Sequence, residues 1–140
     1  MGKSYKKNEV RNTDKGIRYE VMAFKNKKEI EKIKQFLLGK RNKRDYALFV
    51  LGINIGLRTQ DLLTLKIKDV CKELNIKGNY GAHSLRKTFG YWVYVSRVQQ
   101  NPLVLVTLQK MFNHSTQATT LRYIGIDSTE ISNIYQNLNI

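Results

Sequence analysis

The sequence has few of the residues from which disulfide frameworks, metal centres and membrane spans are built. A single cysteine among 140 residues excludes an intrachain disulfide, and its apolar neighbour Val70 favours a packing role for Cys71. Two histidines and one cysteine at scattered positions match no metal-ligand spacing, so we expect no bound metal. Signal-peptide features and bilayer-length apolar runs are also missing, which predicts a cytoplasmic, nucleoid-associated protein with no membrane partner.

Acidic residues are scarce as well. The chain has 11 Asp and Glu against 25 Lys and Arg, a formal net charge of +14. Residues 1–44 contribute +10 of this charge and residues 45–140 contribute +4. Such an excess is typical of a protein that binds a polyanion through its phosphate backbone. No long basic helix with a wide apolar face stands out, so nucleic acid is favoured over a membrane surface.

The apolar spacing predicts a mainly α fold with little or no β-sheet. Helices are expected at 27–38, 43–55, 59–65, 83–97, 102–112, around 121–123 and at 128–138. Ser115 or Thr116 is a candidate cap, and Asp127 with Glu130 forms a capping-box pattern. We expect an extended lead-in at 20–24 and a brief strand at 66–70. Residues 71–82 predict a glycine-containing loop, with a preceding helical turn as an open alternative.

Two parts follow from these patterns. Residues 1–20 are polar and basic and predict a flexible arm, whereas residues 21–140 predict one compact helical domain.

Five residues form a combination suited to chemistry on a phosphodiester: Arg58, His83, Arg86, His114 and Tyr123. On a helix, His83 and Arg86 share a face, where an imidazole and a guanidinium can hold one phosphate. Arg58 follows a glycine turn. Tyrosine is a weak nucleophile at neutral pH, and it needs cations around the phosphate and a base for its proton. Each signal is weak alone, because a solvated basic turn or a packed tyrosine explains it equally well.

Taken in order, the motifs resemble those of the tyrosine recombinase, or phage integrase, catalytic domain. GLRTQDLL (56–63) is similar to the first arginine box, and HSLRKTF (83–89) is similar to the HxxR box. NHS (113–115) and LRYIGI (121–126) resemble the segments with the second histidine and the nucleophilic tyrosine. The resemblance covers about residues 20–140.

The resemblance implies site-specific DNA cleavage and rejoining in integration or recombination. Tyr123 would form a 3′-phosphotyrosyl link, Arg58 and Arg86 would bind the non-bridging oxygens, His83 would assist proton transfer, and His114 would bond to the phosphate. It implies neither ATP nor metal, so no cofactor is expected. The partners would be double-stranded DNA and further copies of a bacterial or phage-encoded chain.

Contacts to DNA and to other copies are also expected at specific places. Lys87 and Arg122 lie beside the motifs, Lys3, Lys6 and Lys7 lie in the arm, and all five are candidate DNA contacts. Self-association is expected through residues 127–140, because family members often dock the segment after the tyrosine on a neighbouring subunit.

Two departures from the family pattern leave alternatives open. Arg58 and His83 are 25 residues apart, whereas the family places a small β-sheet with a catalytic lysine between them, so the chain reads as shortened between 70 and 80. We also expect no amino-terminal DNA-clamping domain. Three interpretations stay open: a minimal integrase, a recombinase-derived DNA-binding regulator or integrase competitor without turnover, and a degenerate fragment.

Overall fold

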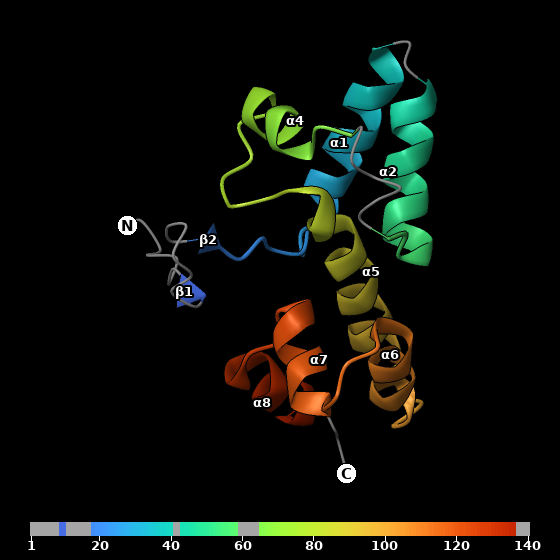
Figure 1. Ribbon diagram of the computed structural model, residues 1–140, viewed down its shortest axis with the longest axis vertical. Coiled ribbons are helices and arrows are strands. Elements are labelled where there is room, and N and C mark those ends of the chain that lie inside the picture. Colours follow the sequence, from blue (N-terminus) through green and yellow to red (C-terminus); the bar gives the residue numbers. More distant parts are fainter. Residues whose placement is uncertain (1–8, 11–17, 41–42, 59–64, 137–140) are drawn as a thin grey trace.

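The computed structural model describes residues 9–10, 18–40, 43–58 and 65–136, and this part of the protein is mainly helical (Figure 1). Its helices are α1 (Lys27–Gly39), α2 (Lys43–Ile55), α4 (Ile67–Glu73), α5 (Ala82–Arg97), α6 (Val104–Phe112), α7 (Gln117–Ile124) and α8 (Ser128–Gln136). The strands β1 (Glu9–Val10) and β2 (Arg18–Tyr19) form a two-residue antiparallel pair. The predicted mainly α fold with little sheet is confirmed.

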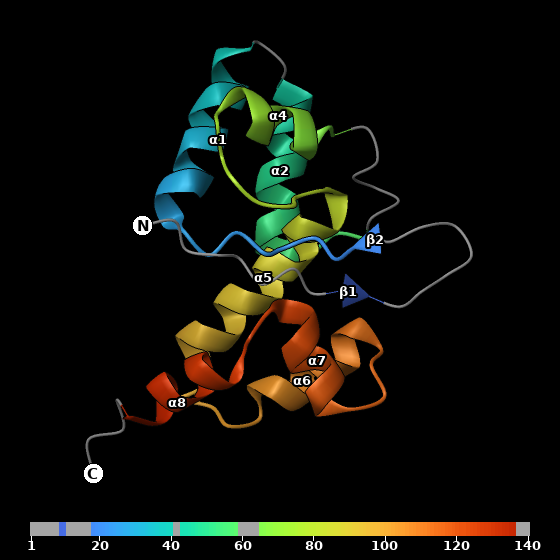
Figure 2. The same cartoon turned by 90° about the vertical axis from the view of Figure 1, so that its left-hand side faces the viewer.

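Helix α5 connects two groups of helices. Helices α1, α2 and α4 lie around its amino-terminal end, and α6, α7 and α8 lie around its other end (Figures 1 and 2). The buried side chains divide in the same way. The first core consists of Phe24, Ile33, Leu37, Phe49, Leu65, Ile67, Val70, Cys71, Ile76, Tyr80 and Leu85. The second core consists of Tyr94, Val104, Leu108, Ile124 and Ile126.

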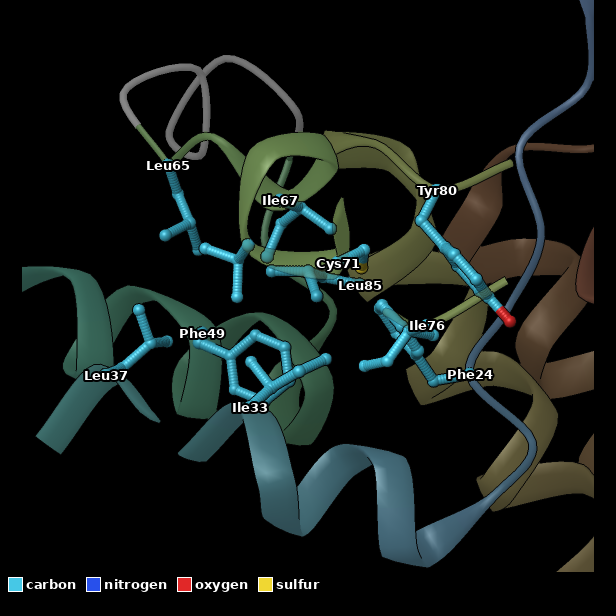
Figure 3. Close-up of a cluster of buried hydrophobic side chains, with 11 residues drawn as sticks. Phe24, Ile33, Leu37, Phe49, Leu65, Ile67, Cys71, Ile76, Tyr80 and Leu85 are labelled. Atoms are coloured by element: carbon cyan, nitrogen blue, oxygen red, sulfur yellow. The ribbon is translucent and has the colours of Figure 1, made fainter. Parts of the chain in front are cut away.

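The first core is built on aromatic contacts and helical spacing (Figure 3). Phe24 stacks on Tyr80 with ring centroids 4.2 Å apart, and it meets Phe49 edge-on at 6.3 Å. Ile33 from α1 points into the same cluster. Cys71 is also buried there, and desolvation raises its pKa to about 11, so its thiol is protonated and inert at neutral pH. The predicted packing role of Cys71 is confirmed.

Several helix ends follow the local rules that the sequence carries. The Thr116 hydroxyl accepts the Thr119 N–H at 3.1 Å and caps α7. At the start of α8, Asp127 and Glu130 each accept the other's backbone N–H, at 2.8 and 3.1 Å. Gly56 follows α2 with a φ of +64°, a conformation that glycine adopts without strain. The starts of α7 and α8 and the end of α2 therefore have a local cause in the sequence.

Two predicted elements need correction. The strand predicted at 66–70 is wrong, because this stretch lies at the start of α4. Ile67, Val70 and Cys71 are spaced three and four apart and all face the first core, so burial favoured the helical period over a short alternation. Helix α6 begins at Val104 instead of Pro102, because the Asn101 side chain accepts the Leu103 N–H at 3.0 Å and holds a turn.

Two further predictions fall mostly on residues that the structure leaves undescribed. The short helix expected at 59–65 lies outside the described residues except for its last position. The flexible arm expected at 1–20 also lies largely outside them, so both stay predictions.

Residues 20–26, called here the lead-in segment, include the stretch predicted to be extended at 20–24, and they cross the amino-terminal half of α5 (Figure 2). The Met22 N–H donates to the Asn79 carbonyl at 2.8 Å. The Phe24 N–H donates to the buried Thr88 hydroxyl at 2.8 Å, and the Trp92 indole donates to the Phe24 carbonyl at 2.8 Å. These bonds satisfy backbone groups that have no sheet partner, and they hold the segment against α5.

Candidate functional site

The first turns of α5 carry three of the predicted basic residues. His83 is exposed, Arg86 is half-buried and Lys87 is buried, at 5% exposure. Partial desolvation, and then the charges of Lys87 and Arg86, lower the pKa of His83 below its ordinary value. His83 is therefore predominantly neutral at pH 7, as a proton acceptor needs to be.

Arg86 lies where the two helical groups meet. Its guanidinium donates to the Gly56 carbonyl at 2.8 Å and to the Met111 carbonyl at 3.3 Å. It also lies over the Phe112 ring, 5.0 Å from the centroid. A guanidinium has five N–H groups, so these two carbonyls leave further donors for other acceptors. Arg86 is thus a cation whose position is fixed by carbonyls from both groups of helices.

Tyr123, on α7, lies close enough to this cation for Arg86 to lower the pKa of its phenol. The rings of His114 and Tyr123 meet edge to face, with centroids 4.9 Å apart, and Phe112 contacts both rings. Arg86, His114 and Tyr123 therefore come together from α5, the turn after α6, and α7.

The turn after α6 orients His114. Asn113 adopts the left-handed conformation at the end of α6, and the His114 N–H donates back to the Gln109 carbonyl at 3.0 Å. The His114 Nδ1 lies 3.0 Å from the Thr120 hydroxyl, which itself donates to the Thr116 carbonyl at 3.3 Å. Because that hydroxyl proton is used, we infer that Nδ1 carries the ring proton, which leaves Nε2 as the acceptor of the neutral ring.

The charges around Tyr123 oppose one another. Burial raises the pKa of Tyr123, the charge of Arg86 and its hydrogen bond lower it, and the charge of Glu20 raises it. The pKa of His114 is lowered, by desolvation first and by Arg86 second. The free site therefore holds a protonated phenol next to the neutral imidazole of His114 and a fixed guanidinium.

Lys87 and Glu20 form an ion pair beside the same tyrosine. The Lys87 ammonium lies 4.9 Å from the centroid of the Tyr123 ring. Glu20 comes from the lead-in segment, 67 residues earlier in the chain. No motif in the sequence connects this carboxylate to Tyr123, so sequence reasoning missed it. The DNA contact expected of Lys87 stays a prediction, and its ammonium is bound to Glu20 in this structure.

The remaining predicted residues lie at the edges. Arg58 is exposed and has no hydrogen bond or ion pair with a described residue; it follows Gly56, whose carbonyl holds Arg86. Arg122 is exposed on α7. Lys3, Lys6 and Lys7 lie outside the described residues.

A cavity of about 530 Å³ adjoins Tyr123. Its polar lining includes Glu20, Lys25, Lys87, Arg122 and Tyr123. Cations and the candidate nucleophile thus border one open space.

Other site types find little support in the described part of the chain. Within it, no group of three or more His, Cys, Asp or Glu side chains is arranged to hold a metal ion. No helix among the described residues combines the length and the apolar composition that crossing a membrane requires.

Comparison with known proteins gives one informative similarity. The chain is 29% identical to a probable integrase/recombinase, YoeC, of Bacillus subtilis (strain 168), over 76% of this chain and 91% of that protein. No family model and no solved structure matches the chain. The aligned 76% of 140 residues is about 106 residues, whereas the alignment spans 170, so about 64 of its positions have no residue of this chain. The chain is thus homologous to a protein named a probable integrase/recombinase, which supports a recombinase-like function.

Proposed function

We propose that this protein binds double-stranded DNA and cleaves and rejoins one strand at a time, as a tyrosine recombinase does, with Tyr123 as the nucleophile. The proposal rests mainly on one observation: Arg86 and His114 both lie beside the Tyr123 phenol. The homology to a probable integrase/recombinase supports the same reaction class. Its action is on DNA in the bacterial cytoplasm.

The chemistry follows from the charges. The Tyr123 oxygen attacks phosphorus, its proton passes to a neutral imidazole, and the bond from phosphorus to the 5′-oxygen breaks. Arg86, with Arg58 from the segment after α2, stabilises the charge that develops on the non-bridging oxygens. The leaving 5′-oxygen takes a proton from water. The products are a 3′-phosphotyrosyl link and a 5′-hydroxyl, and the reverse attack by a 5′-hydroxyl rejoins the strand.

His83 and His114 have separate roles in this scheme. His83 is exposed one helical turn before Arg86, so it can exchange a proton with solvent. His114 faces the Tyr123 ring with Nε2 as its available nitrogen. A neutral His114 accepts the phenol proton, and the resulting imidazolium then donates to the phosphate.

We also propose that the chain lacks the segment which in the tyrosine recombinase family supplies a catalytic lysine. About 64 alignment positions of the relative have no counterpart here. Because Arg58 and His83 are close along the chain, we propose that the shortening lies between residues 70 and 80. Loss of a general acid typically costs about 10²–10⁴ in rate, so cleavage by this chain is expected to be slow.

This shortening favours a second candidate function, that of a DNA-binding regulator or integrase competitor without turnover. Such a protein would use the same cations to hold a phosphate, and it would need no leaving-group acid. Its signature is specific DNA binding that survives the loss of the Tyr123 hydroxyl.

Self-association through residues 127–140 is the last part of the proposal. The described part of this segment contacts its own chain at Glu130, which pairs with Lys25 at 2.9 Å and accepts the Tyr91 hydroxyl at 3.2 Å. Docking on another copy would therefore exchange these contacts for equivalent ones between chains. Glu130→Lys should weaken assembly on paired sites if this exchange takes place.

The deciding experiment uses nicked duplexes from the attachment region of the source element. After cleavage next to a nick, the short fragment with the 5′-hydroxyl diffuses away, so the covalent adduct accumulates. We expect a denaturation-resistant adduct with the unmodified protein and none with Tyr123→Phe. Tyr46→Phe on α2, which changes a tyrosine outside the motifs that packs against the first core, is the matched control. Specific binding without any adduct would support the regulator instead.

A further inference from the structure

Lys87 has an environment that a surface lysine of a basic protein would not have. Its side chain is buried, and Glu20 is the carboxylate with which it forms an ion pair. Burial of an ammonium is costly unless the charge is paired, so Glu20 stabilises this position in the DNA-free protein. Lysines on α1 such as Lys28 and Lys32 are exposed, so the burial of Lys87 is not a general property of lysines in this chain.

Glu20 is the unexpected member of the pair. A carboxylate beside a phosphodiester and an attacking phenol is unfavourable, because it repels the phosphate. It also raises the pKa of Tyr123. A site that takes up a phosphate therefore gains nothing from this charge during the reaction.

The backbone of Glu20 is fixed by hydrogen bonds, whereas its carboxylate is partly exposed to solvent. The Asn79 amide donates to the Glu20 carbonyl at 3.2 Å, and Met22 and Phe24 are bonded as described above. The Glu20 side chain is 30% exposed, whereas that of Lys87 is 6% exposed. A rotation of the glutamate side chain alone would bring the carboxylate into water, without any movement of the lead-in segment.

The cavity provides room for the group that replaces it. Glu20, Lys87, Arg122 and Tyr123 all line the same space of about 530 Å³. An ammonium that leaves a carboxylate oxygen for a phosphate oxygen keeps a charge-assisted hydrogen bond throughout. The four-carbon stem of lysine permits this small displacement.

We propose that Glu20 occupies the place of a DNA phosphate on Lys87 in the free protein, and that the incoming phosphodiester displaces it, so that Lys87 becomes a phosphate-binding residue of the Tyr123 site. This inference rests on the proposed DNA-binding function. It adds an internal competitor, Glu20, which neutralises the charge of Lys87 until DNA enters.

The test measures DNA binding and not cleavage, in the Tyr123→Phe background, so it is independent of turnover. A labelled random-sequence duplex is titrated at several salt concentrations with three further variants: Glu20→Gln, Glu20→Gln with Lys87→Met, and Glu31→Gln. The last removes the same charge from an exposed position on α1 and serves as the control. Circular dichroism and thermal unfolding check that each variant is folded.

Glu20→Gln should bind about two- to fivefold tighter than its parent, the size expected when a partly exposed ion pair no longer competes. Glu31→Gln should change the affinity less. Adding Lys87→Met to Glu20→Gln should lower the slope of log K against log salt by about one, because one phosphate contact is lost.

Four outcomes would overturn the inference. Weaker binding by Glu20→Gln would mean that the pair is structural, and this comparison decides even if the double variant does not fold. An unchanged salt slope in the double variant would mean that Lys87 never contacts phosphate. Absence of duplex binding by every variant would overturn the proposed function as well, whereas binding indifferent to Glu20 and Lys87 overturns this inference alone.

Discussion

The two cores of this protein differ in what surrounds them. The first is a cluster of aromatic and aliphatic side chains with no candidate nucleophile or proton-transfer group among its members. The second is smaller, and the partly buried residues packed against it include Tyr123 and Phe112. The first core therefore mainly stabilises the chain, while the second core positions side chains that we propose take part in the chemistry.

Arg86 connects these two regions. It reaches the Gly56 carbonyl at the end of α2 and the Met111 carbonyl in α6. The candidate site thus depends on both helical groups, although most of its side chains belong to one. Variants that weaken one region at a time separate folding from function.

The largest expected effect is in the first core. Phe49 is fully buried and packs edge-on against Phe24. Phe49→Ala should lower the free energy of unfolding by about 3–5 kcal/mol, from lost burial and the cavity left behind. Urea titration measures this change. Leu51→Ala, at an exposed position of the same helix, should cost far less, and equal losses would mean that Phe49 is not a core residue in solution.

Next comes the link between the regions. Arg86→Ala removes the cation beside the candidate nucleophile, and it leaves the Gly56 and Met111 carbonyls without a hydrogen-bond donor. Adduct formation should therefore fall about 10²–10³-fold. Stability should fall by about 1–3 kcal/mol. The rate is therefore measured under conditions in which the variant is fully folded. Arg97→Ala, exposed on the same helix, is the control, and equal rates for both variants would remove Arg86 from the site.

A close approach in the second region gives a smaller effect. A Cβ on Gly90 would lie 2.6 Å from Ile124 Cγ2 and 2.9 Å from the Phe112 ring. Gly90→Ala should therefore cost about 1–3 kcal/mol, because α5 has to move away from α6 and α7. Gly39→Ala has nothing within 4 Å of the new methyl group and should be neutral or slightly stabilising. Similar unfolding curves for the two variants would contradict the packing at Gly90.

The smallest effect concerns pH. The pKa values of His83 and His114 are lowered in the folded protein from 6.5. The unfolded chain therefore binds more protons than the folded one below about pH 6.5, and stability falls as the pH drops through that range. Thermal unfolding at pH 7 and pH 5 measures the loss. His114→Gln should reduce the difference between the two values, and an unchanged difference would mean that His114 is not responsible for it.

Some elements follow from neighbouring residues alone. The stripe of Ile30, Ile33 and Leu37 predicts α1, and Thr116 and the Asp127–Glu130 pair predict the starts of α7 and α8. These succeed because helical periodicity and capping act within a few residues. The strand expected at 66–70 was wrong for the opposite reason: Cys71, one residue beyond the alternating stretch, completes a helical face whose partner is a distant core.

The site shows the same division. The types and order of the five motif residues could be predicted from the sequence, and their roles stay a proposal. The structure brings Arg86, His114 and Tyr123 together. His83 lies one helical turn before Arg86, and the exposed Arg58 follows Gly56, whose carbonyl holds Arg86. Glu20 could not be found, since a single carboxylate in an extended lead-in has no motif around it.

The sequence by itself determined the strong positive charge, the helical class and the order of the candidate catalytic residues, because each depends on composition or on short spacings. Tertiary structure alone decided that Arg86 is held by carbonyls from both helical groups and that Lys87 is buried against Glu20. Contacts between residues 25 to 67 positions apart arise from the packing of whole helices, and no local pattern records them.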